Sequence, residues 1–202
     1  MLIIGLAGGS GSGKGIVSSL FSVNGIPAFD CDAVYHDLIS RKCRLTRELA
    51  DAFGEEILTK DGGIDRHALF RVAFSDGESR RRLNEISHRR ILAVLREWIE
   101  RAKAQGISAV IVDAPLLFES GFDRECDLTI AVTAKKELRV ERIVSRDGIS
   151  REEAEKRIAA QISDDELEKR ADYTLLNNGD VAALVKEVNR ILKKINERRN
   201  EQ

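Results

Sequence analysis

An apolar segment at the amino terminus runs directly into a glycine-rich turn, and this junction constrains the fold more than any other feature of the chain. Leu2–Ala7 (LIIGLA) is a continuous apolar run, which is typical of a parallel strand covered on both faces. The turn GGSGSGKG follows, and apolar side chains then recur at helical spacing as far as the helix stop at Asn24-Gly25. A strand, a tight turn and a helix in this order predict the opening of an α/β fold.

The glycine-rich turn matches the phosphate-binding pattern G-x-x-x-x-G-K-[S/T] at Gly8, Gly13 and Lys14. Glycines let backbone N–H groups turn inward around an anion, and the following helix directs its positive end toward the same place. Lys14 adds a mobile positive charge for the β- and γ-phosphates. A flexible connector rich in Gly and Ser is the alternative, but the buried strand before the turn and the amphipathic helix after it favour nucleotide binding.

The last position of the pattern is altered, because Gly15 stands where a serine or threonine hydroxyl normally contacts the magnesium that accompanies the nucleotide. Ser18 and Ser19 lie about one helical turn further on, roughly 5.4 Å away, which is too far for direct contact with the metal. Magnesium keeps several of its waters and needs few protein ligands. We therefore expect a weakened magnesium site and not an abolished one.

The rest of the chain alternates between strand and helix patterns. Four further segments are predicted strands: Ile26–Asp30, Ser108–Leu117, Asp127–Ala134 and Tyr173–Leu176. From Ala33 to about Gly106 the pattern is helical, with little strand signal over some 75 residues. Ser150 and Ser163 each have a glutamate three residues later, which is the capping-box signature of a helix start. These elements predict one doubly wound α/β unit with an inserted helical lobe.

Acidic residues follow the predicted strands at the positions where such folds bind ligands. Asp30 and Asp32 follow the second strand, and Asp113 sits at the carboxyl end of the third. Open parallel sheets bind ligands outside the carboxyl ends of their strands. A carboxylate there can accept the proton of a substrate hydroxyl or hold magnesium, the two acidic roles in phosphoryl transfer. Helix caps and turn acids are the alternative for any one of them, but three beside a phosphate loop favour function.

Two arginine-rich segments are candidates for contact with phosphate. Arg142 and Arg146 are four residues apart, so they share a helix face and could close over a transferring phosphoryl group. A solvated helix with Glu–Arg pairs is the alternative, and the charge pattern alone favours it. Ser79–Arg90 concentrates five arginines with His88, which indicates either a pocket for a phosphorylated small molecule or an ordinary charged surface.

Bulk composition excludes several classes of partner. The formal net charge of −1 over 202 residues gives no support to nucleic-acid or anionic-membrane binding. No apolar run approaches the roughly 20 residues of a membrane-spanning helix, and no export signal is evident, so we expect a cytoplasmic protein. The three cysteines form no C-x-x-C pair and the three histidines show no ligand spacing, so a metal held by protein side chains alone is not expected.

Six segments together, in this order, resemble the dephospho-coenzyme A kinases, which phosphorylate the ribose 3′-hydroxyl of dephospho-CoA with ATP. The segments are GLAGGSGSGKG, FDCDAVYHDL, LNEISHRRI, VDAPLLFESG, RDGISREEAEKRIAAQ and ADYTLLNNG. The chain departs from the family where Arg89 replaces the usual proline, and where Gly15 and Ile16 replace a Ser-Thr pair. The loss of both hydroxyls puts turnover in doubt but not the fold.

The resemblance implies a P-loop NTPase-type three-layer α/β/α fold with a parallel sheet. It divides the single domain 1–202 into a core (about 1–32, 107–135 and 172–202), a helical insert (about 33–106) that binds the coenzyme, and a helical lid (about 136–171). It implies ATP and Mg²⁺ as cofactors and dephospho-CoA as the small-molecule partner of a monomer or weak homo-oligomer, with no nucleic acid and no membrane.

The resemblance also assigns roles to individual residues. Asp32 corresponds to the catalytic base, and Lys14, Arg142 and Arg146 to the groups that stabilise the phosphates. The implied nucleotide-binding residues are Gly11, Ser12, Gly13, Lys14, Gly15, Ile16 and Asn178. The implied substrate-binding residues are Asp32, His88, Pro115, Leu116 and Phe118, and Asp113 is the candidate for Mg²⁺ bound through ATP. Two alternatives stay open: a catalytically silent nucleotide-binding protein disabled by Gly15, and a kinase for another small hydroxyl-bearing metabolite.

Overall fold

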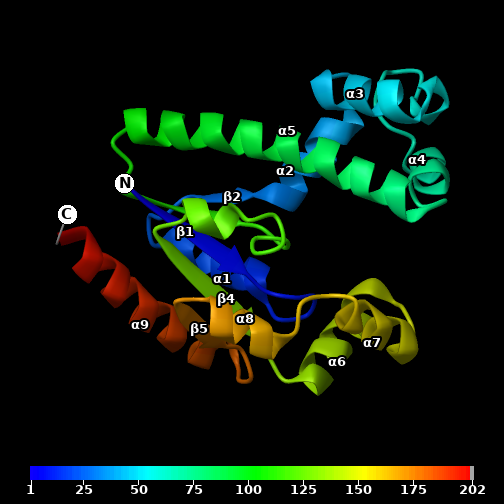
Figure 1. Ribbon diagram of the computed structural model, residues 1–202. Helices are drawn as coiled ribbons and strands as arrows, with labels where there is room; N and C mark the ends of the chain where they lie inside the picture. Colours follow the sequence, from blue (N-terminus) through cyan, green and yellow to red (C-terminus); the bar gives the residue numbers. More distant parts are fainter. Residues whose placement is uncertain (201–202) are drawn as a thin grey trace. The chain divides into compact units, whose positions relative to one another are not determined.

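The computed structural model describes residues 1–200 and divides the chain into two compact units (Figure 1). One unit comprises Met1–Phe29 and the chain from Ala102 onward, and the other comprises Asp30–Arg101. The first contains the sheet and the second is helical. Among residues 1–200, no helix combines the length and the apolar character needed to cross a bilayer.

The sheet has five strands in the spatial order β2-β3-β1-β4-β5. The strands are β1 (Leu2–Ala7), β2 (Ala28–Asp30), β3 (Ala109–Asp113), β4 (Leu128–Thr133) and β5 (Tyr173–Leu176). β1 runs parallel to both β3 and β4, and β4 runs parallel to β5. β3 and β4 are buried along their whole length, as their unbroken apolar runs predict. β3 ends at Asp113, earlier than predicted, because Pro115 lacks a backbone N–H and the chain turns there.

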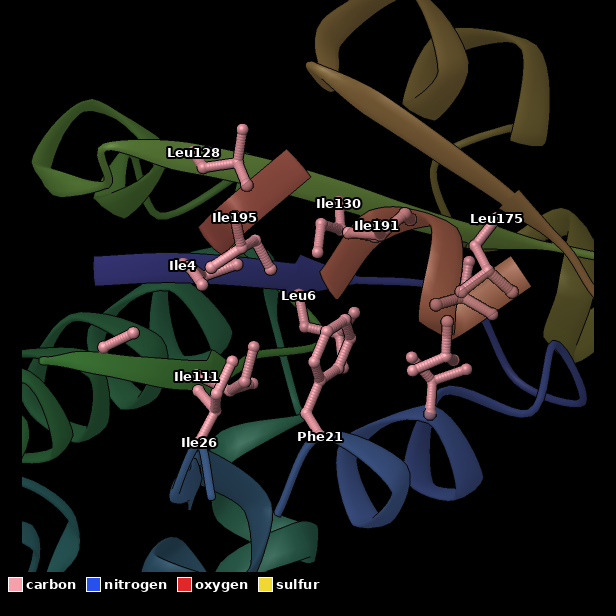
Figure 2. Packing of buried hydrophobic residues seen from close by; sticks show 14 of the residues in the cluster. Ile4, Leu6, Phe21, Ile26, Ile111, Leu128, Ile130, Leu175, Ile191 and Ile195 are labelled. Carbon is pink, nitrogen blue, oxygen red and sulfur yellow. The ribbon is translucent and has the colours of Figure 1, made fainter. Parts of the chain in front are cut away.

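One face of the sheet is covered by α1 and α9. Beyond the strands, this unit contains the helices α1 (Lys14–Val23), α6 (Lys136–Asp147), α7 (Arg151–Ala159), α8 (Asp164–Arg170) and α9 (Val181–Asn200), with the short 3₁₀ helix η2 (Phe122–Glu125). Figure 2 shows Phe21 of α1 and Ile191 of α9 in one buried cluster with side chains of the central strands, such as Leu6 and Ile130. The apolar side chains of these two helices therefore face the core.

The opposite face of the sheet packs against α8 and the segment that follows β3. Thr129 and Thr133 alternate with Ile130 along β4, so their side chains point away from the cluster in Figure 2. The Thr133 hydroxyl donates to Glu168 of α8 at 3.1 Å. Space above Gly5 of β1 is filled by Leu117, whose side chain lies close to where a Cβ at Gly5 would be. The expected three-layer α/β/α arrangement is confirmed.

The unit Asp30–Arg101 has a hydrophobic core of its own. Its elements are α2 (Cys31–Ser40), α3 (Arg44–Phe53), the 3₁₀ helix η1 (Glu55–Ile57), α4 (Arg66–Ala73) and most of α5 (Gly77–Ala104). Leu45, Leu49 and Ile57 are almost fully buried in this core together with Leu69 of α4. A local apolar cluster of this kind is what allows a helical segment to fold as a compact insert.

Glu48 joins α3 to α5 in this helical unit and gives a testable pH dependence. Its carboxylate accepts hydrogen bonds from Arg90 (Nε at 2.8 Å) and from Arg89 (3.2 Å). The hydrogen bond from Arg90 is the main cause that lowers the pKa of Glu48 from 4.5 to about 2. We expect Glu48→Gln to lower the free energy of unfolding at pH 7 by about 1–2 kcal/mol.

The lowered pKa of Glu48 determines the pH range over which this carboxylate stabilises the folded protein. A carboxyl whose pKa is lowered by folding stabilises the native state fully above its unfolded pKa of 4.5, and that contribution is lost as the pH falls toward 2. Denaturant titrations of both proteins between pH 7 and pH 3 should show a constant difference that shrinks below about pH 4.5. Glu55→Gln is the control, because its ion pair with Arg47 is two-thirds exposed. Equal losses in both variants would contradict this account.

Candidate functional site

The phosphate loop lies between β1 and α1, and two of its glycines are required by the backbone. Gly11 has φ 77° and Gly13 has φ 91°, a left-handed conformation that L-residues with a side chain rarely adopt. A Cβ at Gly11 would lie 2.5 Å from the carbonyl oxygen of Arg139, and one at Gly13 would collide with the side chain of Asn177. The loop is therefore shaped both by its own glycines and by residues of α6 and of the segment after β5, which pack against it.

Three consecutive carbonyl groups of the loop are held by side chains from elsewhere in the same unit. The carbonyl oxygen of Ser10 accepts from Arg139 Nε at 2.9 Å, and that of Gly11 accepts from Arg142 Nη1 at 3.1 Å. The carbonyl oxygen of Ser12 accepts from Asn177 Nδ2 at 2.8 Å. Side-chain donors of the protein thus satisfy all three of these carbonyl oxygens.

The loop amides divide into two groups. The Ser10 amide donates to Gln161 Oε1 at 2.9 Å, that of Ser12 to Gly9 O at 3.1 Å, and that of Ile16 to Gly13 O at 3.0 Å. Within residues 1–200, the amides of Gly11, Gly13 and Gly15 donate to no protein acceptor. Unpartnered amides at the start of a helix form a binding site for a phosphate group.

Lys14 and Asp113 form an ion pair at the carboxyl ends of β1 and β3. Lys14 Nζ donates to Asp113 Oδ1, and the two side chains are only 15% and 4% exposed. The pairing of β1 with β3 places Asp113 directly beside Leu6, so the strand register brings the carboxylate to the phosphate loop. Asp113 is therefore an acidic group that pairs directly with the lysine of the loop.

The serine hydroxyls near Gly15 differ in their contacts. Ser19 Oγ donates to Gly15 O at 2.9 Å, so it is used within α1. Ser12 is fully buried and its hydroxyl has no hydrogen-bond partner among the described atoms. A Cβ added at Gly15 would meet nothing within 4 Å, so a hydroxyl side chain fits there. The described residues contain no group of three or more His, Cys, Asp or Glu side chains arranged for a metal.

The two predicted lid arginines have different environments. Arg142 reaches the loop carbonyl of Gly11 and also donates to Asn177 O at 3.0 Å. Arg146 is 62% exposed and forms an ion pair with its neighbour Asp147 at 2.7 Å. Arg139, which the sequence analysis did not single out, is the arginine of α6 that is buried against the loop. Its spacing of three residues from Arg142 was the only available signal, since i and i+3 share a helix face.

Asn177 and Asn178 follow β5 and make different contacts. Asn177 is buried. Besides the hydrogen bond from its side chain to the loop, its backbone N–H donates to Thr133 O at 2.8 Å. Asn178 is exposed, and its Oδ1 accepts from the backbone amide of Lys135 at 2.7 Å. The pair thus ties together the loop, the end of β4 and the start of α6.

The candidate substrate residues lie in two parts of the chain. Pro115, Leu116 and Phe118 follow β3; Leu116 is exposed, whereas Phe118 is buried beneath the Arg170 guanidinium, which lies 4.6 Å from the ring centroid. Asp32 and His88 belong to the helical unit: Asp32 is exposed in the first turn of α2, and His88 is half-buried on α5.

Asp30 has a clear structural use. Its side chain accepts a hydrogen bond from the Ala33 amide at 2.9 Å and caps α2. Of the two aspartates that end β2 and begin α2, Asp30 is therefore the helix cap, and Asp32 is the one whose exposed carboxylate is compatible with contact to a substrate.

A central parallel sheet in the order β2-β3-β1-β4-β5, with a glycine-rich phosphate loop between β1 and α1, defines a kinase of the P-loop fold. Comparison with known proteins gives the particular family. The family model described as dephospho-CoA kinase matches residues 2–183, so the chain belongs to the dephospho-CoA kinase family of phosphotransferases. Because the family is one of kinases, ATP is the expected phosphoryl donor.

Individual relatives agree with this assignment. A dephospho-CoA kinase from Corynebacterium glutamicum is 39% identical over 200 residues, which cover 99% of this chain and 100% of the relative. The solved structure of TT1252 from Thermus thermophilus has a TM-score of 0.81 and 35% identity, covering 96% of this chain and 97% of that one. A dephospho-CoA kinase from Campylobacter jejuni has a TM-score of 0.71 and 25% identity, covering 96% of each chain.

Proposed function

We propose that this chain transfers the γ-phosphoryl group of ATP to the ribose 3′-hydroxyl of dephospho-CoA and releases coenzyme A and ADP. The observation that carries the proposal is the phosphate loop itself, in which Lys14 is present and the amides of Gly11, Gly13 and Gly15 have no acceptor among residues 1–200. Membership of the dephospho-CoA kinase family supplies the acceptor.

The nucleotide is held by the loop and by the segment after β5. In this proposal the ATP-binding residues are Gly11, Ser12, Gly13, Lys14, Gly15, Ile16 and Asn178. Lys14 exchanges Asp113 for the β- and γ-phosphates when ATP binds, and Arg142 and Arg146 stabilise the charge that spreads over the transferring oxygens. The carboxylate of Asp113 would then be available to the ion that accompanies ATP.

Magnesium fits this site only as a partner of ATP. Gly15 offers no hydroxyl and Asp113 is a single carboxylate, so the residues present suit an ion that keeps most of its waters and is bound through phosphate oxygens. If Mg²⁺ is bound together with ATP, Asp113 would be the side chain that helps to hold it, and the ion would neutralise the negative charge of the phosphates.

Asp32 is the proposed general base. Its carboxylate accepts the proton of the 3′-hydroxyl as the ribose oxygen bonds to the γ-phosphorus and the bond to the β-phosphate oxygen breaks. Asp32 and His88 in the insert (about 33–106), with Pro115, Leu116 and Phe118, would contact the coenzyme. The lid (about 136–171) closes over the phosphates, and the core comprises about 1–32, 107–135 and 172–202. We propose that the protein acts in the cytoplasm as a monomer or weak homo-oligomer.

The test is ADP formation by the purified protein from ATP and excess magnesium, with and without dephospho-CoA, and with adenosine and shikimate as other hydroxyl acceptors. ADP release that depends on dephospho-CoA supports the proposal. Release that depends on another acceptor identifies a different kinase. ATP binding without transfer to any acceptor favours the silent nucleotide-binding protein, the alternative that Gly15 raises.

Restoring the hydroxyl at position 15 should lower the magnesium requirement. Position 15 is in the first turn of α1 and has open space for a side chain, so Gly15→Ser adds a metal ligand without a clash. We expect the magnesium concentration for half-maximal rate to fall by several-fold, on the order of the effect of one hydrogen bond to a charged group. Gly15→Ala is the matched control, because it makes the same change to the helix without the hydroxyl. Identical magnesium titrations for the two variants would contradict the assigned defect.

A further inference from the structure

We propose that Arg139 is a positioning residue, which holds the phosphate loop in its nucleotide-binding conformation before ATP binds. The inference rests on the proposed function in one respect only, namely that the loop binds the phosphates of ATP. Arg139 is 3% exposed, so its guanidinium is not available to a ligand in this conformation, and its effect must pass through the residues that it contacts.

Arg139 uses its nitrogen atoms on three different residues. Nε donates to Ser10 O at 2.9 Å, Nη1 to Asp164 Oδ1 at 2.7 Å and Nη2 to Gln161 Oε1 at 3.4 Å. Asp164 and Gln161 both belong to the segment from the end of α7 to the start of α8. One side chain therefore connects the phosphate loop to that segment.

Gln161 makes two further hydrogen bonds to Ser10. Its Oε1 accepts from the Ser10 amide at 2.9 Å, and its Nε2 donates to Ser10 Oγ at 3.3 Å. The amide, carbonyl and hydroxyl of Ser10 are thus all held by the Arg139–Gln161 pair. Holding three atoms of one residue fixes both its position and the direction of its peptide groups.

The loop also packs closely on Arg139 at two glycines. A Cβ at Gly9 would collide with the Arg139 guanidinium, and one at Gly11 would lie 2.9 Å from the Arg139 Cα. The side chain and the main chain of Arg139 therefore each occupy the space beside one loop glycine. This explains why the loop has glycine at Gly9, where φ is not in the left-handed region.

These contacts set the direction of the phosphate-binding amides through the peptide geometry. In a trans peptide the carbonyl of one residue and the N–H of the next point in opposite directions, and every peptide bond among residues 1–200 is trans. Fixing the Ser10 carbonyl toward Arg139 turns the Gly11 N–H to the opposite side. Asn177, which holds the Ser12 carbonyl, does the same for the Gly13 N–H.

Gly11 and Gly13 are two of the residues whose amides have no acceptor in the described chain. The carbonyl contacts thus keep phosphate-binding donors directed away from the protein before a ligand is present. Preorganised donors bind more tightly, because ATP does not have to order them.

ATP affinity in calorimetry, at high magnesium and without any acceptor substrate, tests the role of Arg139. We expect Arg139→Met to raise the dissociation constant for ATP about tenfold, the effect of losing one or two hydrogen bonds from a charged donor. Arg139→Lys should recover part of the affinity. Arg151→Met is the matched control, because Arg151 lies on α7 in an exposed ion pair with Glu155 and should leave ATP affinity unchanged.

Two further variants test the positioning role of Arg139 if Arg139→Met fails to fold. Gln161→Ala removes the contacts to the Ser10 amide and hydroxyl, and Asp164→Asn weakens the anchor of Arg139 without contacting the loop. Both should raise the ATP dissociation constant several-fold, and Gln161→Ala should speed hydrogen exchange of the Ser10 amide in NMR of the nucleotide-free protein. Unchanged ATP affinity in both variants would overturn the proposal.

A purely structural residue would give a different pattern. Loss of folded protein lowers the active fraction, and hence kcat, without raising KM for ATP, whereas the positioning role raises KM for ATP and leaves KM for the acceptor unchanged. Because the calorimetry contains no acceptor, a protein that does not phosphorylate dephospho-CoA still reports on the loop. Failure of the proposed reaction is therefore distinguishable from failure of this inference.

Discussion

Replacing Asp32 by asparagine is expected to lower kcat by about 10²- to 10⁴-fold while leaving the affinity for ATP close to that of the wild type. The size of the loss is that of a general base removed from a proton-transfer step. The asparagine side chain has nearly the same shape but cannot accept the proton of the ribose hydroxyl. Single-turnover measurements with dephospho-CoA and ATP separate this chemical step from binding and product release.

Asp30→Asn is the matched control for this prediction. Asp30 is two residues away and caps α2 through the Ala33 amide, and asparagine caps a helix as well as aspartate does. We therefore expect Asp30→Asn to keep nearly full activity and stability. Equal losses in the two variants would show that charge at this strand end, and not a base at Asp32, supports the reaction. Wild-type turnover in Asp32→Asn would exclude Asp32 as the base.

Replacing Lys14 by methionine is expected to have the second large effect, a loss of about 10²- to 10³-fold in kcat/KM for ATP. This is the usual result of removing one group that stabilises charge on a transferring phosphoryl oxygen. The structure adds a complication, because Lys14 is also the ion-pair partner of the buried Asp113. Breaking a buried pair leaves a charge without compensation, so the single variant should lose stability as well as activity.

The double variant Lys14→Met with Asp113→Asn separates the two effects. Removing the carboxylate together with its partner leaves no unpaired charge, so we expect the double variant to regain much of the stability that the Lys14 variant loses. Activity should stay low, since the Lys14 ammonium group that would bind the phosphates is still missing. Recovery of activity along with stability, measured by thermal unfolding and ATP turnover, would mean that Lys14 serves the fold and not the nucleotide.

Much of the fold could be predicted from the sequence wherever local patterns are strong. The strands Leu2–Ala7 and Tyr173–Leu176 have the predicted bounds. Ser150 and Ser163 cap α7 and α8 as expected. These elements are determined by neighbouring residues, so periodicity and cap chemistry are sufficient to locate them.

Helix α5 shows where local patterns fail. The helical pattern predicted from Ala33 to about Gly106 did not give the bounds of this helix, which begins at Gly77 and includes the arginine-rich segment Ser79–Arg90. That segment has few apolar residues, so its pattern does not distinguish a helix from a charged loop. Its residues Arg89 and Arg90 contact Glu48, which is 41 and 42 residues away in the chain. Such tertiary contacts cannot be recognised from the local sequence pattern.

The candidate site could be predicted only where it follows a motif. The motif identified Lys14 and the loop glycines, and the strand-end argument identified Asp113. Gln161 ends the segment RDGISREEAEKRIAAQ, but neither its contact with the loop nor that of Arg139 could be predicted, because both bind backbone groups of Ser10, and any residue provides those groups. Arg146 shares a helix face with Arg142, but spacing alone does not reveal that the adjacent Asp147 pairs with it.

The most direct test of the central claim is phosphorus NMR of the product formed from dephospho-CoA, ATP and magnesium. We predict a new phosphate monoester on the ribose 3′-oxygen, formed in a one-to-one ratio with ADP and identical to authentic coenzyme A. A monoester at another oxygen, or no product at saturating magnesium with both the wild type and Gly15→Ser, would contradict the claim that this chain is a dephospho-CoA 3′-kinase.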